Sequence, residues 1–203
     1  MYRIPFVIKA QQAQDAGKLV SLAPDFERAC ALGGVENFSV WCVNEYIFGY
    51  GELQGEDTGV FDGVFKKLPG ELSLVCAPGS MRLMYHCIGI VREDKSLIRH
   101  RVFVTKLKPG CEEEYKRRHD ALIEARGDAV PEGPESDFTI WYGDGHIFGY
   151  CELVRAYDDH VPTEEETAAT VAWEKRGLEI MDWLTDDVDW ITGEKHPKIK
   201  RLL

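Results

Sequence analysis

The sequence repeats itself at an interval of 100 residues, and this duplication limits the possible folds more than any other feature. The segment FSVWCVNEYIFGYGEL at residues 38–53 returns without a gap as FTIWYGDGHIFGYCEL at residues 138–153, and half of the aligned positions are identical. Upstream, FVIK at residues 6–9 matches FVTK at residues 103–106. An internal repeat of this length indicates two structural units in tandem.

Hydrophobic pattern and turn residues predict the same order of elements in both units. Residues 4–10 and 101–107 alternate or are rich in β-branched side chains, which is typical of strands. Residues 111–126 follow a Pro-Gly pair, carry acidic residues first and basic residues later, and stop at Gly127, which predicts a helix. The repeated segment has aromatic and β-branched arms around polar turn residues, as β-hairpins do.

A second helix is predicted after the second hairpin. Thr163 and Glu166 have the spacing of a capping box, and we expect the helix over residues 167–184. Gly177 lowers the helix propensity and is a possible break. The residues expected to share the inner face of this helix are Trp173, Ile180 and Leu184.

Residues 82–91 and 199–203 are the predicted last strands, which completes a β-α-β-β-α-β order in each unit. We therefore expect an α+β fold of two ferredoxin-like units, at residues 1–97 and 98–203. Helices cover one face of each antiparallel sheet, so the two units are expected to bury their remaining faces against each other.

Composition and charge exclude several classes of protein. Lys and Arg number 24 against 35 Asp and Glu, a net charge of −11, so nucleic acid is not an expected partner. No apolar run approaches the roughly 20 residues that cross a bilayer, and the first apolar stretch is too short for a signal peptide. The six cysteines lack the spacing of metal sites. We expect a cytoplasmic protein with reduced thiols and no membrane partner.

One predicted helix face carries groups that could do chemistry. Tyr115, His119 and Leu122 fall at positions i, i+4 and i+7, and the apolar Leu122 indicates that this stripe is directed toward the sheet. His119 is then either a core histidine satisfied by its neighbours, or a general acid or base with Tyr115 as its hydrogen-bonding neighbour. The six histidines lack metal-ligand spacing, so no metal site is expected.

The two units differ at this stripe. Counting from the matched strands, Tyr115 aligns with Lys18 and His119 aligns with Leu22. The first unit therefore keeps the scaffold without the pair. We expect one working site in the second unit and a structural partner in the first, although ordinary sequence drift gives the same pattern.

Tryptophans and glutamates near the hairpins are the other candidates. Trp41 and Trp141 occupy the same place in both copies, which favours packing over ligand contact. Trp173 has no counterpart in the first unit and either lines a sugar site or anchors its helix. Glu52 and Glu152 also recur, and we expect them to face solvent or an arginine.

Residues 101–190 resemble the L-rhamnose mutarotase family. The similarity rests on VFV at residues 102–104, EEYKRRH at residues 113–119 and IW at residues 140–141, and the first unit shares it only through the repeat. The resemblance implies a dimeric α+β barrel, formed here within one chain. It also implies an activity without metal or cofactor that interconverts the α and β anomers of a 6-deoxy aldose such as L-rhamnose.

The same resemblance implies roles for individual residues. His119 matches the acid/base group, Tyr115 matches a substrate-binding tyrosine, and Trp173 matches a tryptophan that lines the pocket. Trp141 stands where the family tends to have tyrosine and is a further candidate for substrate contact. The family usually has two adjacent tryptophans on the second helix, whereas Trp173 is followed here by Glu174.

Two other functions fit the same architecture. One is a non-catalytic sugar-binding or regulatory module, and the other is a cofactor-free oxidoreductase that resembles the antibiotic-biosynthesis monooxygenases. A monosaccharide is the expected ligand of a mutarotase and of a sugar-binding module. The sequence leaves open whether the internal pseudo-dimers associate further into homo-oligomers.

Overall fold

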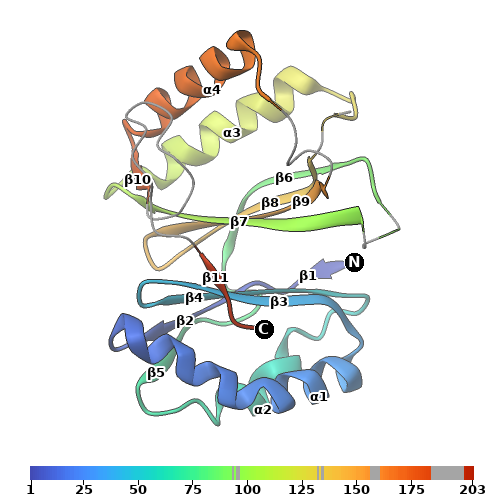
Figure 1. The fold of residues 1–203 in the computed structure, drawn as a ribbon, viewed down its shortest axis with the longest axis vertical. Coiled ribbons are helices and arrows are strands. Elements are labelled where there is room, and N and C mark those ends of the chain that lie inside the picture. The colour runs from blue at the N-terminus through green and yellow to red at the C-terminus, as the bar shows by residue number, and fades with distance from the viewer. Residues whose placement is uncertain (93, 95–96, 132, 134, 156–160, 184–198) are drawn as a thin grey trace. The chain divides into compact units, whose positions relative to one another are not determined.

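The computed structural model describes residues 1–92, 94, 97–131, 133, 135–155, 161–183 and 199–203 (Figure 1). The chain divides into two compact units, which we name unit 1 (Met1–Met81 with Ile199–Leu203) and unit 2 (Arg82–Lys198). Each unit carries one antiparallel sheet together with helices, so the predicted mixed α+β class with antiparallel sheets is confirmed. No helix in the described ranges is both long and apolar enough to span a membrane.

Unit 1 has the predicted order of strand, helix, hairpin and helix, but the strand that follows is formed by residues 72–76 rather than by residues 82–91. Its sheet has the strand order β11-β3-β4-β2-β5, with the short β1 also paired to β4. Its elements are β1 (Tyr2–Arg3), β2 (Phe6–Ala10), the 3₁₀ helix η1 (Ala13–Leu22), α1 (Ala23–Gly33), β3 (Val35–Val43), β4 (Tyr46–Leu53), the 3₁₀ helix η2 (Thr58–Phe61), α2 (Asp62–Phe65), β5 (Leu72–Cys76) and β11 (Lys200–Arg201).

Unit 2 repeats this plan with longer helices. Its sheet has the order β10-β7-β9-β8-β6, and all of its described strand pairs are antiparallel. Its elements are β6 (Arg82–Gly89), β7 (Ile98–Leu107), α3 (Glu112–Arg126), β8 (Glu135–Gly143), β9 (His146–Val154), α4 (Glu164–Gly177) and β10 (Met181–Trp183). The first of these helices, predicted over residues 111–126, has nearly the predicted bounds.

The compact units differ from the division at residues 97 and 98 that the repeat indicated. β6, predicted as the last strand of the first copy, pairs with β8 of unit 2, and β11 pairs with β3 of unit 1. The exchange has a physical reason. The outer strand of each hairpin has one unpaired ladder edge, and a short strand from either copy can satisfy it. Local pattern alone does not specify which copy supplies that strand.

Two glycines show why the repeated hairpin keeps its sequence. A Cβ atom on Gly49 would lie 2.0 Å from Cζ of Phe6, and a Cβ atom on Gly149 would lie 2.0 Å from Cε1 of Phe103. Strand β2 in unit 1 and strand β7 in unit 2 therefore each lay a phenyl ring on the backbone of the hairpin. Only glycine leaves room for that contact.

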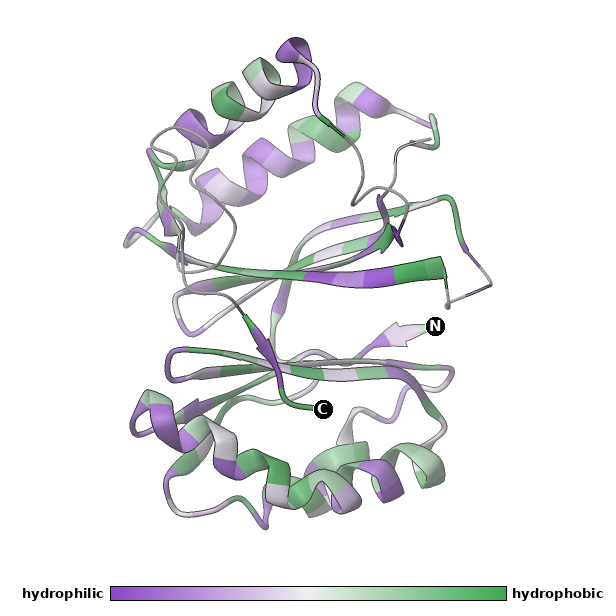
Figure 2. Ribbon diagram, viewed as in Figure 1, coloured by the Kyte–Doolittle hydropathy of each residue, from purple (hydrophilic) through white to green (hydrophobic). Residues whose placement is uncertain are grey.

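The layer between helices and sheet is filled differently in the two units. Unit 1 holds a cluster of phenylalanine rings with centroids 5.1–6.4 Å apart, and these rings belong to Phe6, Phe26, Phe38, Phe61 and Phe65. Unit 2 instead buries Tyr115 among aliphatic and methionine side chains. Figure 2 shows α3 hydrophilic over most of its length, as expected for a helix that buries few side chains.

The structure corrects three expectations, about the end of a helix and about buried side chains. The second helix ends at Gly177 rather than continuing to residue 184, because the chain turns and pairs as β10 with β7, while Leu184 lies outside the described residues. Leu122 is 40% exposed, so the stripe turns away from the sheet after His119. Glu52 and Glu152 are buried, with exposures of 7% and 1%, so solvent, one of the two surroundings expected for them, is wrong.

Candidate active site

Helix α3 places an aromatic pair against the interior of unit 2. Tyr115 and His119 lie one turn apart on the same helix face, and they are only 5% and 7% exposed. Their rings stack with centroids 4.3 Å apart and an angle of 24° between the planes. The other faces of α3 carry charged side chains that form ion pairs, such as those of Arg117 and Arg118 with Glu114. The helix therefore directs two buried groups with titratable protons into one place.

The surroundings of His119 determine which ring nitrogen is available. Nδ1 lies 3.0 Å from the backbone oxygen of Tyr115, and a carbonyl oxygen can only accept a hydrogen bond. Nδ1 therefore carries the proton and donates it. Nε2 is left as the lone-pair nitrogen, without a hydrogen-bond partner in the part of the chain that the structure describes. Burial lowers the pKa of His119 below its ordinary value, so this neutral form prevails at pH 7.

The pKa of Tyr115 shifts in the opposite direction to that of His119. Burial raises the pKa of its hydroxyl well above the ordinary value, and the negative charge of Glu174 adds to the effect. The phenol therefore stays protonated and can donate a hydrogen bond. A neutral base and a neutral donor stand side by side, which is the pairing that simultaneous removal and delivery of protons requires.

Two further aromatic side chains enclose the imidazole. Trp173 of α4 meets the His119 ring edge-on, with centroids 5.6 Å apart and an interplanar angle of 86°. Tyr85 of β6 lies 5.4 Å from the same ring at 63°, and its hydroxyl accepts a hydrogen bond of 3.2 Å from Arg126. His119 thus sits among flat apolar surfaces contributed by α3, α4 and β6.

A cavity of about 30 Å³ opens between α3 and the end of α4. Each helix lines it with residues at i, i+3 and i+4, and these are Tyr115, Arg118, His119, Trp173, Arg176 and Gly177. This volume holds one or two water molecules. A pyranose ring is larger, so it can enter fully only if the lining side chains move apart.

The lining is unsuited to a metal ion. It offers a single imidazole together with two guanidinium groups, and no carboxylate from the described residues lines it. Its aromatic walls and few polar groups are those of a site for a small organic molecule.

The structure brings together three of the four site residues predicted from the sequence. Tyr115, His119 and Trp173 line one cavity. Trp141 does not join them, because it pairs in register with Phe148, while its neighbour Ile140 belongs to the core between sheet and helices.

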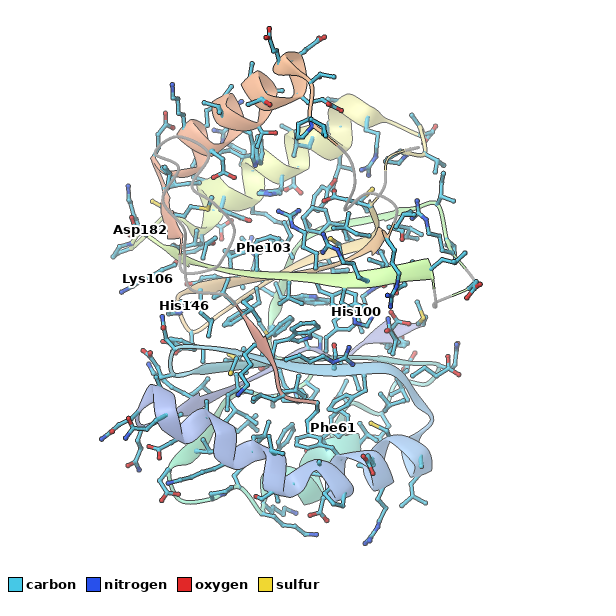
Figure 3. The ribbon with its side chains drawn as sticks, viewed as in Figure 1. Phe61, His100, Phe103, Lys106, His146 and Asp182 are labelled. Atoms are coloured by element: carbon cyan, nitrogen blue, oxygen red, sulfur yellow. The ribbon has the colours of Figure 1, made fainter. Side chains whose placement is uncertain are left out.

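The two faces of the sheet can be followed on its labelled side chains. In Figure 3, Phe103 lies on the helix side of β7, whereas His100 and His146 lie on the opposite side. His146 is in the same strand as Phe148 and two positions away, so Trp141 shares that opposite face.

Sequence reasoning missed Tyr85, Arg118 and Arg176. Tyr85 belongs to a strand assigned to the first copy, so nothing local linked it to His119. Arg118 could have been found, because it precedes His119 and lies three residues after Tyr115 on the same helix face. Arg176 stands in the same relation to Trp173.

Comparisons with known proteins bear on unit 2 most directly. A family model described as L-rhamnose mutarotase matches residues 100–201. A search of curated proteins finds no match. Among solved structures, a provisionally named monooxygenase from Lactobacillus acidophilus NCFM is similar at 10% identity over 89% of this chain and 90% of that chain, with a TM-score of 0.43.

A second provisionally named monooxygenase, from Fusobacterium nucleatum subsp. nucleatum, is similar at 10% identity over 97% of this chain and 98% of that chain, with a TM-score of 0.44. The family match covers just over half of the chain and includes Tyr115, His119 and Trp173, whereas Tyr85 lies before its first residue. The chain belongs to the L-rhamnose mutarotase family.

Proposed function

We propose that this protein is an aldose mutarotase that interconverts the α and β anomers of a 6-deoxy sugar such as L-rhamnose, with its site in unit 2. The observation that carries the proposal is the state of His119, whose Nδ1 proton is engaged by its own helix while Nε2 is left to a ligand. Family membership supports the reaction class. His119 is the proposed catalytic residue, and Tyr115 and Trp173 are the proposed substrate contacts.

The proposal includes the architecture. Each sheet with its helices is a ferredoxin-like unit, and unit 1 is a structural partner without a working site. The strand order of each sheet, in which β3-β4-β2-β5 of unit 1 corresponds to β8-β9-β7-β10 of unit 2, supports the assignment of each unit.

The proposed reaction moves two protons and breaks one carbon–oxygen bond. His119 Nε2 takes the proton of the anomeric hydroxyl while the ring oxygen receives a proton, so the ring opens to an aldehyde. Rotation about the bond between C1 and C2 presents the other face of the aldehyde. Reclosure then returns both protons and gives the other anomer. A single well-placed acid or base contributes about 10²- to 10⁴-fold to such a step.

Tyr115 is placed to assist at the ring oxygen, which receives a proton as the ring opens. Because its pKa is raised, the hydroxyl remains a donor through the neutral range and can hydrogen-bond the ring oxygen as charge develops there. Trp173 offers a flat face beside the imidazole, as expected for a wall that packs on the apolar side of a pyranose.

Anomer exchange measured by magnetisation-transfer NMR tests the proposal. Wild-type protein should accelerate exchange of L-rhamnose, and His119→Ala should lose about 10²-fold or more of that acceleration while its melting temperature changes little. L-Fucose and other aldoses define the sugar preference. Saturable sugar binding without acceleration would instead support the binding-module alternative, and oxygen consumption with an aromatic substrate would support the monooxygenase alternative.

A further inference from the structure

The end of α4 is held by two cations from other parts of unit 2. Arg118 of α3 donates to the backbone oxygen of Arg176 and, over 2.8 Å, to the carboxylate of Glu179. Lys108 donates to the backbone oxygens of Leu178 and Glu179 at 2.6 and 3.2 Å. The last carbonyls of a helix lack intrahelical partners and carry partial negative charge, so cations stabilise them.

The position of helix α4 depends on these contacts, because α4 has no buried side chain, whereas α3 buries Tyr115 and His119. Trp173 in α4 is only half-buried. The N-terminus of α4 is closed by its own capping box between Thr163 and Glu166, which does not tie it to the rest of the unit. A helix with so little buried apolar surface gains little from packing.

Arg118 is well placed to fix the distance between the two helices. Its side chain is only 13% exposed, and it lines the cavity beside His119. On its own helix it is anchored by Glu114 at 2.7 Å, so the guanidinium spans from a fixed point on α3 to the last turn of α4. Arg176 lies three residues after Trp173, so holding its carbonyl also holds the Trp173 end of the helix.

We propose that Arg118 is a positioning residue, a clasp that holds α4 against α3 so that Trp173 stays in contact with His119 and the cavity excludes bulk water. The inference deepens the proposed function and rests on it for its effect on catalysis. Loosening the clasp lets the sugar bind without the wall that orients it. Misplacement by about 1 Å costs up to 10²-fold in rate.

Arg117 provides a matched control on the same helix. It also pairs with Glu114, at 2.7 Å, but its side chain is 71% exposed and its described contacts stay on α3. Arg117→Gln and Arg118→Gln therefore remove the same charge from adjacent positions. Only the second substitution releases α4.

The first readout is the titration of His119 followed by NMR, which needs no catalytic activity. The charged and titratable groups around the ring come from α3, β6 and α4, and they are Tyr115, Lys116, Arg118, Asp120, Tyr85, Glu174 and Arg176. Opening the clasp admits water, so the pKa of His119 should rise toward its ordinary value of about 6.5 in Arg118→Gln and stay at the wild-type value in Arg117→Gln.

Glu179→Ala separates the clasp from simple charge effects. Losing the Glu179 carboxylate would by itself lower the pKa of a nearby histidine, whereas opening the clasp raises it. A rise in both Arg118→Gln and Glu179→Ala is the expected result. Glu179→Ala also keeps the Arg118 pair with Glu114, so it carries the test if Arg118→Gln does not fold.

The second readout is anomer exchange. Arg118→Gln should lower kcat/KM about tenfold or more, with Arg118→Lys in between because an ammonium replaces only part of the fork. A titration and an exchange rate that match those of Arg117→Gln would overturn the clasp. Absence of exchange in wild-type protein would contradict the proposed function instead, and the titration would still decide on the clasp.

Discussion

The space between helices and sheet is filled by phenylalanine rings in unit 1, whereas in unit 2 it contains a cavity. In unit 1, the ring centroid of Phe26 lies 6.0 Å from that of Phe6 and 5.4 Å from that of Phe61. The three residues are at most 1% exposed. In unit 2, the corresponding layer contains His119 and a cavity of about 30 Å³. A duplicated scaffold thus allows one copy to be packed for stability while the other retains titratable groups and empty space.

The comparison predicts that stability depends more on unit 1. Phe26→Ala should lower the free energy of unfolding by about 3 to 5 kcal/mol, because it leaves a cavity among rings that cannot collapse. Leu22→Ala, at the position aligned with His119, should cost about 2 to 5 kcal/mol, since Leu22 is only 8% exposed. Chemical denaturation measures both. Losses no larger than that of His119→Ala would show that the two layers are equally tight.

The paired hairpin glycines sharpen the comparison. Gly49→Ala and Gly149→Ala each force a phenyl ring to move, at a cost of about 1 to 3 kcal/mol. Gly49→Ala should cost more, because Phe6 is fully buried whereas Phe103 is half-buried and can shift. Thermal unfolding of the two variants provides the measurement. The reverse order would mean that unit 2 is the more rigid layer.

Activity should depend on pH through His119 alone in the neutral range. The pKa of His119 is lowered by burial, so Nε2 is a free base at pH 7 and the exchange rate should be flat there. The rate should fall only as pH drops through a midpoint below about 6.5. The unfolded chain binds a proton at His119 more readily than the folded protein does. The free energy of unfolding should therefore also decrease as the pH falls below about 6.5. A rate that rises as pH falls to 5 would assign His119 the opposite role.

Leu122→Ala should have the smallest effect. The side chain is 40% exposed and lies beyond the buried part of α3, so we expect less than about 0.5 kcal/mol. Denaturation curves of the variant and wild type should coincide. A loss above 2 kcal/mol would restore the sheet-facing stripe that the sequence suggested.

Local patterns predicted β2, β7, both hairpins, α3 and the meeting of Tyr115 with His119, because these depend on residues near each other in sequence; they did not predict β5 or β10. Period-two alternation would also have excluded Trp141, since its neighbour Ile140 faces the helices. The end of α4 at Gly177 depends on the pairing of β10 with β7, which no local pattern specifies. The Tyr85 contact depends on the exchange of β6, a choice between two equivalent sheet edges.

The protonation state of His119, and its contact with the sugar, decide whether this histidine acts as the base. Nitrogen-15 NMR of the imidazole at pH 7, with and without L-rhamnose, reports both. We predict a neutral ring with its proton on Nδ1 and an Nε2 signal that moves saturably as the sugar is added. A proton on Nε2, or an Nε2 signal that stays fixed while the protein accelerates anomer exchange, would contradict it.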